Sequence, residues 1–175
     1  DDHGLTVRRF KSEKVDRLAF DRLNTLVMSG SPVSVEDGDQ FAALHINSIA
    51  LYEYLAAHTG AYDWICFIPY LFGTTLNGSA LCPERSVLIP CLHDEGYARI
   101  QPVHEAFKRA NRIVFHTQAE EQLAQQIYGE TQAKHGVIGE GTATKLSADG
   151  EQFRTKYGIQ DPFMLYCGRK NASKN

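Results

Sequence analysis

Four short apolar runs that alternate with helical patterns constrain the fold of this chain most. They lie at residues 64–68, 86–90, 112–115 and 135–138. Each has about the length of a strand, and a strand that is apolar throughout is typical of a sheet covered on both faces, as parallel sheets are. Because helical patterns separate the runs, the sequence predicts βαβ units and an α/β fold with a parallel sheet flanked by helices.

Helices are indicated by apolar residues at helical spacing. This spacing predicts one helix over residues 13–28, capped by Ser12, and a second, continuous helix over residues 39–58. A third helix is expected over residues 102–110. Residues 5–10 alternate weakly between apolar and polar side chains, which indicates a short strand before the first helix.

Capping residues place the remaining helices. Thr117 and Glu120 have the spacing of a capping box, in which the Thr117 hydroxyl accepts from a helix amide and Glu120 reaches back to the helix start. The helix that they begin is expected to end at Gly129. Ser147 is expected to cap a last short helix that ends at Gly158.

Composition restricts the class of protein. The 175-residue chain is 43% hydrophobic and 22% charged, which is typical of a soluble globular domain, and its net charge of -3 does not favour nucleic acid. No apolar run approaches the roughly 20 residues of a membrane helix. Cys66 and Cys167 lie inside apolar runs, so we expect buried, reduced thiols and a cytoplasmic protein.

Polar residues that directly follow the predicted strands are the first candidates for a site, because ligands of open parallel sheets bind at the carboxyl ends of the strands. His93 follows the run at residues 86–90 and precedes Asp94 and Glu95. Its imidazole can donate to a hydroxyl or to a developing negative charge, and a carboxylate can fix its tautomer. The alternative is that His93 is a polar loop histidine that only packs on its neighbours. His116 has a similar position, where a structural role beside a helix cap is the favoured interpretation.

Two other strand exits supply further candidates for a cleft or an acceptor side. Tyr70 and Thr74 follow the first apolar run, where they shape either a pocket wall or a simple turn into a helix. Gly139 and Gly141 follow the run at residues 135–138. Glycine permits positive φ in a loop, but this short pattern is too general for a phosphate-binding fingerprint.

The last residues of the chain contain its clearest anion-binding pattern. An apolar run at residues 163–167 ends at Gly168, and Arg169 and Lys174 follow. Arginine recognises phosphate bidentately and lysine supplies a point charge. We therefore expect a strand and a turn that present both cations to an anion, with two solvent-facing cations as the alternative.

The order and spacing of these segments resemble the retaining glycosyltransferases of family 4 (group 1). Residues 168–175 (GRKNASKN) resemble the Gly-Arg-x-x-x-x-Lys segment that opens the carboxyl-terminal domain of that family. Residues 88–94 (LIPCLHD) look like its strand followed by a histidine. Residues 110–117 (ANRIVFHT) look like its strand, Ser/Thr and helix, and residues 153–159 (FRTKYGI) like its lead-in to the second domain. The likeness covers residues 62–175.

The resemblance implies a GT-B architecture, in which two Rossmann-like domains face each other across a cleft. Residues 1–160 would form an acceptor-side domain that lacks its first strands, and residues 161–175 would begin a nucleotide-sugar domain. In the family, the positions of Arg169 and Lys174 contact the donor diphosphate, and the position of His93, the candidate catalytic residue, lies near the transferred sugar. Such enzymes need no metal, because fixed cations and a helix amino terminus offset the charge of the leaving diphosphate.

The resemblance thus implies part of a retaining enzyme that transfers a hexosyl unit from a nucleotide diphosphate sugar to a glycan, lipid or small-molecule acceptor. Nothing before Leu5 matches the first strand and Gly-rich loop of the family. The pair of glutamates that the family has in its second domain would lie beyond Asn175. We therefore expect the 175 residues alone to be inactive. A GT-B nucleotide-sugar epimerase and a non-catalytic Rossmann-like binding module are the alternatives. The expected location is cytoplasmic, and peripheral contact with the inner face of a membrane stays open.

Overall fold

The computed structural model describes residues 4–142, 144, 145, 147 and 149–168. It divides into two compact units, residues 1–140 and residues 141–175. The domain boundary predicted after residue 160 stays a prediction.

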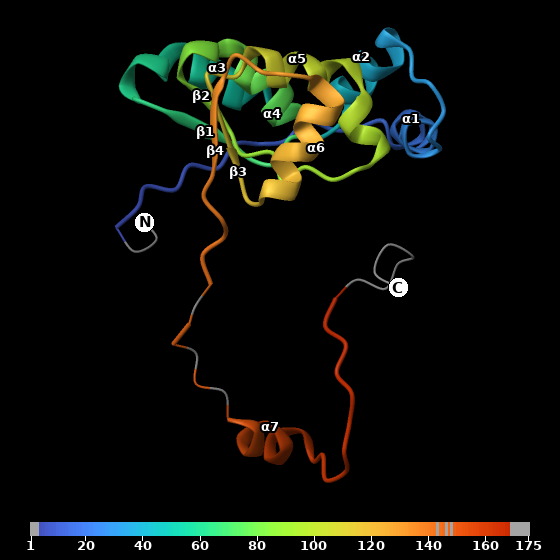
Figure 1. Cartoon of the computed structure of the whole chain (residues 1–175), viewed down its shortest axis with the longest axis vertical. Coiled ribbons are helices and arrows are strands. Elements are labelled where there is room, and N and C mark those ends of the chain that lie inside the picture. The colour runs from blue at the N-terminus through green and yellow to red at the C-terminus, as the bar shows by residue number, and fades with distance from the viewer. Residues whose placement is uncertain (1–3, 143, 146, 148, 169–175) are drawn as a thin grey trace. The chain divides into compact units, whose positions relative to one another are not determined.

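The first unit is built on a four-stranded parallel sheet in the order β1-β2-β3-β4 (Figure 1). The strands fall in the four apolar runs, at β1 (Ile65–Phe67), β2 (Ser86–Leu88), β3 (Arg112–Phe115) and β4 (Lys134–Val137). The predicted α/β fold, a Rossmann-like parallel sheet flanked by helices, is therefore confirmed. Burial differs between the strands, because β2 is buried throughout, whereas the edge strand β4 is exposed throughout and Cys66 in the edge strand β1 is exposed. The prediction of a buried Cys66 is wrong for that reason.

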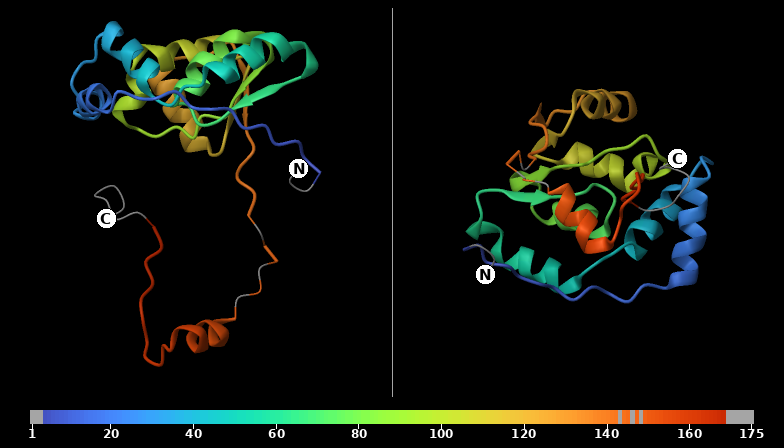
Figure 2. Two further views of the ribbon diagram at one scale, coloured as in Figure 1. Left: turned by 180° about the vertical axis from the view of Figure 1, so that it is seen from behind. Right: turned by 90° about the horizontal axis from the view of Figure 1, so that it is seen from below.

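Helices pack along this sheet and enclose one apolar core. The α-helices are α1 (Arg17–Met28), α2 (Val35–Leu44), α3 (Ile49–His58), α4 (Gly73–Gly78), α5 (Gln101–Arg109) and α6 (Gln118–Tyr128), and the 3-10 turns are η1 (Thr59–Ala61), η2 (Ser79–Leu81), η3 (Pro83–Arg85) and η4 (Gly96–Arg99). Helix α6 contacts β3 and β4, and the right view of Figure 2 shows α3 at the opposite end of this unit. Among the described residues, no helix is long and apolar enough to cross a bilayer.

The single helix predicted over residues 39–58 is wrong, because two helices stand in its place. Helix α2 ends at Leu44, and Ile46 takes a positive φ of 39° before α3 begins. The Asn47 amide donates to the carbonyls of Ala42 and Ala43 at the end of α2. The Ser48 hydroxyl then accepts from the Leu51 amide and caps α3, so two adjacent polar side chains replace the hydrogen bonds of a continuous helix.

The beginning of the chain differs from the prediction in the same way. The Asp16 carboxylate accepts from the Leu18 and Ala19 amides, so Asp16, and not Ser12, is the cap of α1. Residues 6–16 have no regular structure, and Leu5 makes only an isolated bridge, so the strand predicted over residues 5–10 is wrong.

In the second unit, the described residues contain one helix, α7 (Gly150–Tyr157). Asp149 caps it in place of the predicted Ser147, and Gly158 ends it with a left-handed φ of 66°, as predicted. Residues 163–167 lie in no strand and Cys167 is exposed, so the buried strand predicted there is wrong. An apolar run forms a strand only beside a partner strand, and the described residues of this unit contain no strand that could pair with it.

Candidate functional site

An open pocket of about 560 Å³ lies where the parallel strands end. The loop after β2, the end of β3, the first turn of α6 and the residue at position 140 after β4 all contribute to it. Its polar side chains are those of Cys91, His93, Asp94, His116, Thr117, Glu120 and Glu140. The pocket thus occupies the edge of the sheet at which a site was predicted.

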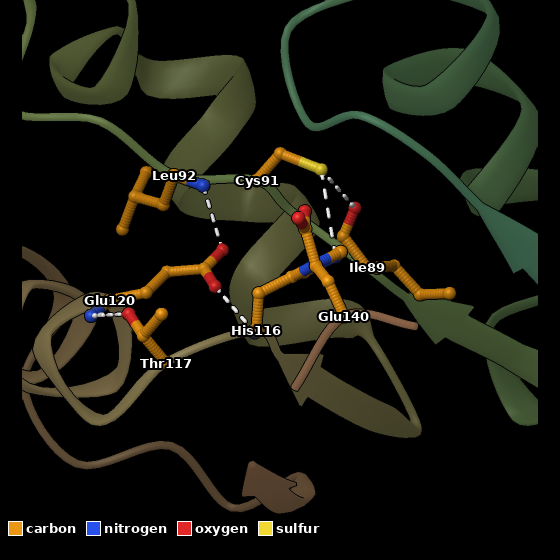
Figure 3. Close-up of polar contacts among 7 residues, drawn as sticks. All are labelled: Ile89, Cys91, Leu92, His116, Thr117, Glu120 and Glu140. Atoms are coloured by element: carbon orange, nitrogen blue, oxygen red, sulfur yellow. Dashed lines mark hydrogen bonds and ion pairs between the residues drawn. The ribbon is translucent and has the colours of Figure 1, made fainter. Parts of the chain in front are cut away.

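A buried carboxylate joins two strand exits at the base of this pocket. Glu120 is 7% exposed, and its two oxygens accept from the Leu92 amide at 2.7 Å and from the His116 amide at 2.6 Å (Figure 3). The Thr117 hydroxyl accepts from the Glu120 amide, which confirms half of the predicted capping box. The other half is wrong, because Glu120 stabilises the loop after β2 and the end of β3 rather than the start of its own helix.

His116 connects a thiol with a second carboxylate. Its Nε2 atom lies 3.7 Å from Cys91 Sγ, and its Nδ1 atom lies 2.8 Å from Glu140 Oε1 (Figure 3). The Glu140 contact is close but out of line for a good hydrogen bond, and the buried Nδ1 atom has no other partner among the described residues. His116 therefore lines the pocket, and the structural role favoured from its sequence position stays a prediction.

Cys91 enters the pocket from a strained backbone. Its φ of 53° is uncommon for a residue other than glycine, and it directs the half-buried thiol toward His116. Burial raises the pKa of this thiol, and the negative charges of Glu120 and Glu140 raise it further. The sulfur therefore keeps its proton near neutral pH unless a base removes it.

His93 is the free polar group of the pocket. Its side chain is exposed, and no hydrogen bond engages its imidazole within the part of the chain that the structure describes. Asp94 pairs with Arg99 at 2.6 Å, and Glu95 accepts from the Tyr70 hydroxyl at 2.7 Å. Both neighbouring carboxylates thus have other partners, and neither of them holds the His93 ring.

The remaining predicted residues do not line this pocket. Tyr70 is fully buried, and burial together with the Glu95 hydrogen bond raises its pKa, so it supports the loop from beneath. Thr74 lies in α4, where its amide donates to the Ile46 carbonyl. Gly139 has a positive φ of 74° directly before Glu140.

Three further predicted residues belong to the second unit, residues 141–175. Gly141 is exposed at its start. Arg169 and Lys174 lie outside the described residues, so the predicted phosphate-binding turn stays a prediction.

Sequence reasoning missed three side chains of the pocket. Glu120 was assigned only to a helix cap, and Cys91 and Glu140 were not among the residues predicted for this site. A signal existed for all three, because each lies at or just after the carboxyl end of a predicted strand.

A scan of protein-family models and searches of curated proteins and solved structures found no match to this chain.

Proposed function

We propose that this chain is part of a retaining glycosyltransferase that transfers a hexosyl unit from a nucleotide diphosphate sugar to a glycan, lipid or small-molecule acceptor. The observation that carries the proposal is the unengaged imidazole of His93 in a pocket at the carboxyl edge of a parallel sheet. The resemblance of residues 62–175 to such enzymes supports the same reaction.

The charge of the pocket favours the acceptor side of that reaction. The carboxylates of Asp94, Glu120 and Glu140 line it, and the described lining residues include no lysine or arginine. Such a surface repels a diphosphate and suits a ligand rich in hydroxyl groups, whose protons carboxylate oxygens accept. The volume of about 560 Å³ lies within the roughly 300–1,000 Å³ that is usual for small-molecule sites.

The roles of the proposed site residues follow from the resemblance. His93 hydrogen-bonds the transferred sugar or orients the attacking acceptor hydroxyl. Arg169 and Lys174 stabilise the leaving diphosphate while the bond to the anomeric carbon breaks, which fixed cations do without a metal. The donor would therefore depend on the last residues of the chain, and the acceptor on the pocket beside His93.

The test uses the full-length protein with nucleotide diphosphate sugars and candidate acceptors, and it follows transfer by mass spectrometry. Replacing His93 with Ala should lower turnover by about 10²-fold, the contribution of one positioned polar group. His58→Ala is the matched control, because His58 is also exposed but belongs to α3 and not to the pocket. Equal turnover of the two variants would contradict the role of His93.

A second variant tests the donor side separately. Arg169→Ala should weaken donor binding and slow turnover, and unchanged values of both would remove the diphosphate role. Incubation with a donor and no acceptor distinguishes the epimerase, since only that enzyme would convert the sugar to its epimer under these conditions.

A further inference from the structure

We propose that Cys91 is a covalent-modification site that reacts with small uncharged electrophiles, with His116 as its proton acceptor and the nearby Glu140 carboxylate as the group that favours the proton on His116 Nδ1. This proposal does not rest on sugar transfer, because the reaction needs neither the donor nor the residues beyond Gly168.

A nucleophile, a base and a carboxylate lie in sequence around His116. Glu140 Oε1 lies 2.8 Å from Nδ1, out of line for a hydrogen bond, but its negative charge favours the tautomer that carries the proton on Nδ1. Nε2 then presents a lone pair to the Cys91 thiol, whose sulfur lies 3.7 Å away (Figure 3). A base within reach of a nucleophile is the arrangement that activates thiols and hydroxyls.

The reaction requires no oxidant. With a haloacetamide, a bond forms between Cys91 Sγ and the methylene carbon of the reagent, and the bond between that carbon and the halogen breaks. The halide leaves with the electron pair of that bond. The thiol proton passes to His116 Nε2 and from there to water.

The pocket selects the charge of the electrophile. The carboxylates of Glu120 and Glu140 line the same space, and Asp94 lies there paired with Arg99, so the excess negative charge repels an anionic reagent and leaves a neutral one unaffected. A sulfur adduct would occupy the pocket beside His93, and modification of Cys91 would therefore compete with any ligand bound there.

The other cysteines of this chain provide internal controls. Cys66 and Cys167 are exposed and show how fast unassisted thiols react, and Cys82 is 0% exposed and reacts only if the protein unfolds. On exposure alone, Cys66 and Cys167 would react before the half-buried Cys91. A faster reaction at Cys91 therefore measures the assistance by His116.

The experiment treats the protein with limiting iodoacetamide or iodoacetate and measures the rate at each cysteine by peptide mass spectrometry. Cys91 should react with iodoacetamide faster than Cys66 and Cys167. The ratio of the iodoacetamide rate to the iodoacetate rate should also be larger at Cys91 than at the two exposed thiols. The reagents have nearly the same size, so this ratio reports the charge of the pocket.

Variants test the base. His116→Asn should slow the reaction at Cys91 by about tenfold or more. His58→Asn is the control, because His58 is exposed on α3 and lies outside the pocket, and it should leave the rate unchanged. Labelling of Cys82 would reveal an unfolded variant, and His116→Gln then replaces His116→Asn as the deciding change.

Two results would overturn the proposal. One is slower alkylation of Cys91 than of both exposed cysteines in the unchanged protein. The other is an unaltered Cys91 rate in a folded His116→Asn protein. Loss of transferase activity in His93→Ala does not affect either of these two results. The alkylation of Cys91 and the transfer of sugar can therefore be contradicted independently.

Discussion

At the scale of single residues, Glu120 determines the shape of the pocket more than any side chain that faces a ligand. It is buried, and each of its oxygens accepts from the backbone amide of a different strand exit. A carboxylate that accepts two backbone hydrogen bonds replaces the water that those amides would otherwise bind. The positions of His93 and His116 therefore depend on one buried charge.

Replacement of Glu120 by Gln should destabilise the protein by about 1–3 kcal/mol, because the amide NH₂ would face one of the two backbone donors and leave it unsatisfied. Urea denaturation measures the free energy of unfolding. Glu130→Gln is the matched control, since Glu130 is exposed and follows the same helix. If both variants lose the same small amount of unfolding free energy, the Glu120 carboxylate does not hold the two strand exits in place.

At the scale of elements, the contact between α1 and η4 holds the segment that follows His93. A Cβ atom added to Gly96, the first residue of η4, would lie 1.9 Å from the Val27 carbonyl oxygen of α1. Backbone atoms cannot move aside as a flexible side chain can, so only glycine permits this approach. Helix α1 thereby restricts where the loop from Cys91 to Glu95 can lie.

Gly96→Ala should therefore destabilise the protein by about 1–3 kcal/mol or more, as overpacking against rigid neighbours does. Gly60→Ala should change stability by less than about 0.5 kcal/mol, because a Cβ atom at Gly60 meets nothing within 4 Å. Thermal denaturation of both variants checks the difference. Similar midpoints for the two would show that α1 and η4 separate without cost.

At the scale of the whole molecule, two histidines make stability depend on pH. Burial lowers the pKa of His45, which lies among the rings of Phe20, Phe41 and Phe72. Burial, and then the charge of Lys108, lower the pKa of His104. Below about pH 6.5 the unfolded chain binds protons at these positions that the folded protein does not, so stability is lost as the pH falls below that value.

Urea midpoints should accordingly fall between about pH 7.5 and about pH 5.5, and His45→Phe should reduce this fall because phenylalanine cannot bind a proton. The same substitution also changes the stability at every pH, because the Leu71 carbonyl loses the hydrogen bond that His45 Nδ1 makes. His58→Ala, an exposed control, should keep the full dependence. If the urea midpoint of His45→Phe falls as far between these two pH values as that of the unchanged protein, His45 is not the group responsible.

The predictions that succeeded rest on local patterns. The four apolar runs became the strands of a parallel sheet, and Gly129 and Gly158 ended their helices. The predictions that failed required knowledge of competing local partners. Asn47 and Ser48 divided a predicted helix because their side chains bind nearby backbone groups, and apolar periodicity does not register such bonds.

The sequence by itself determined the α/β fold, the parallel sheet and the edge where a pocket lies, because strand length, apolar pattern and helix caps act over a few residues. Only the tertiary structure decided which side chains meet at that edge. Leu92 and Glu120 are 28 positions apart, and Cys91 and His116 are 25 apart. Such pairs depend on strand register and loop conformation, which no local pattern specifies. For that reason His93 could be identified from its position, whereas the group of Cys91, His116 and Glu140 required the fold.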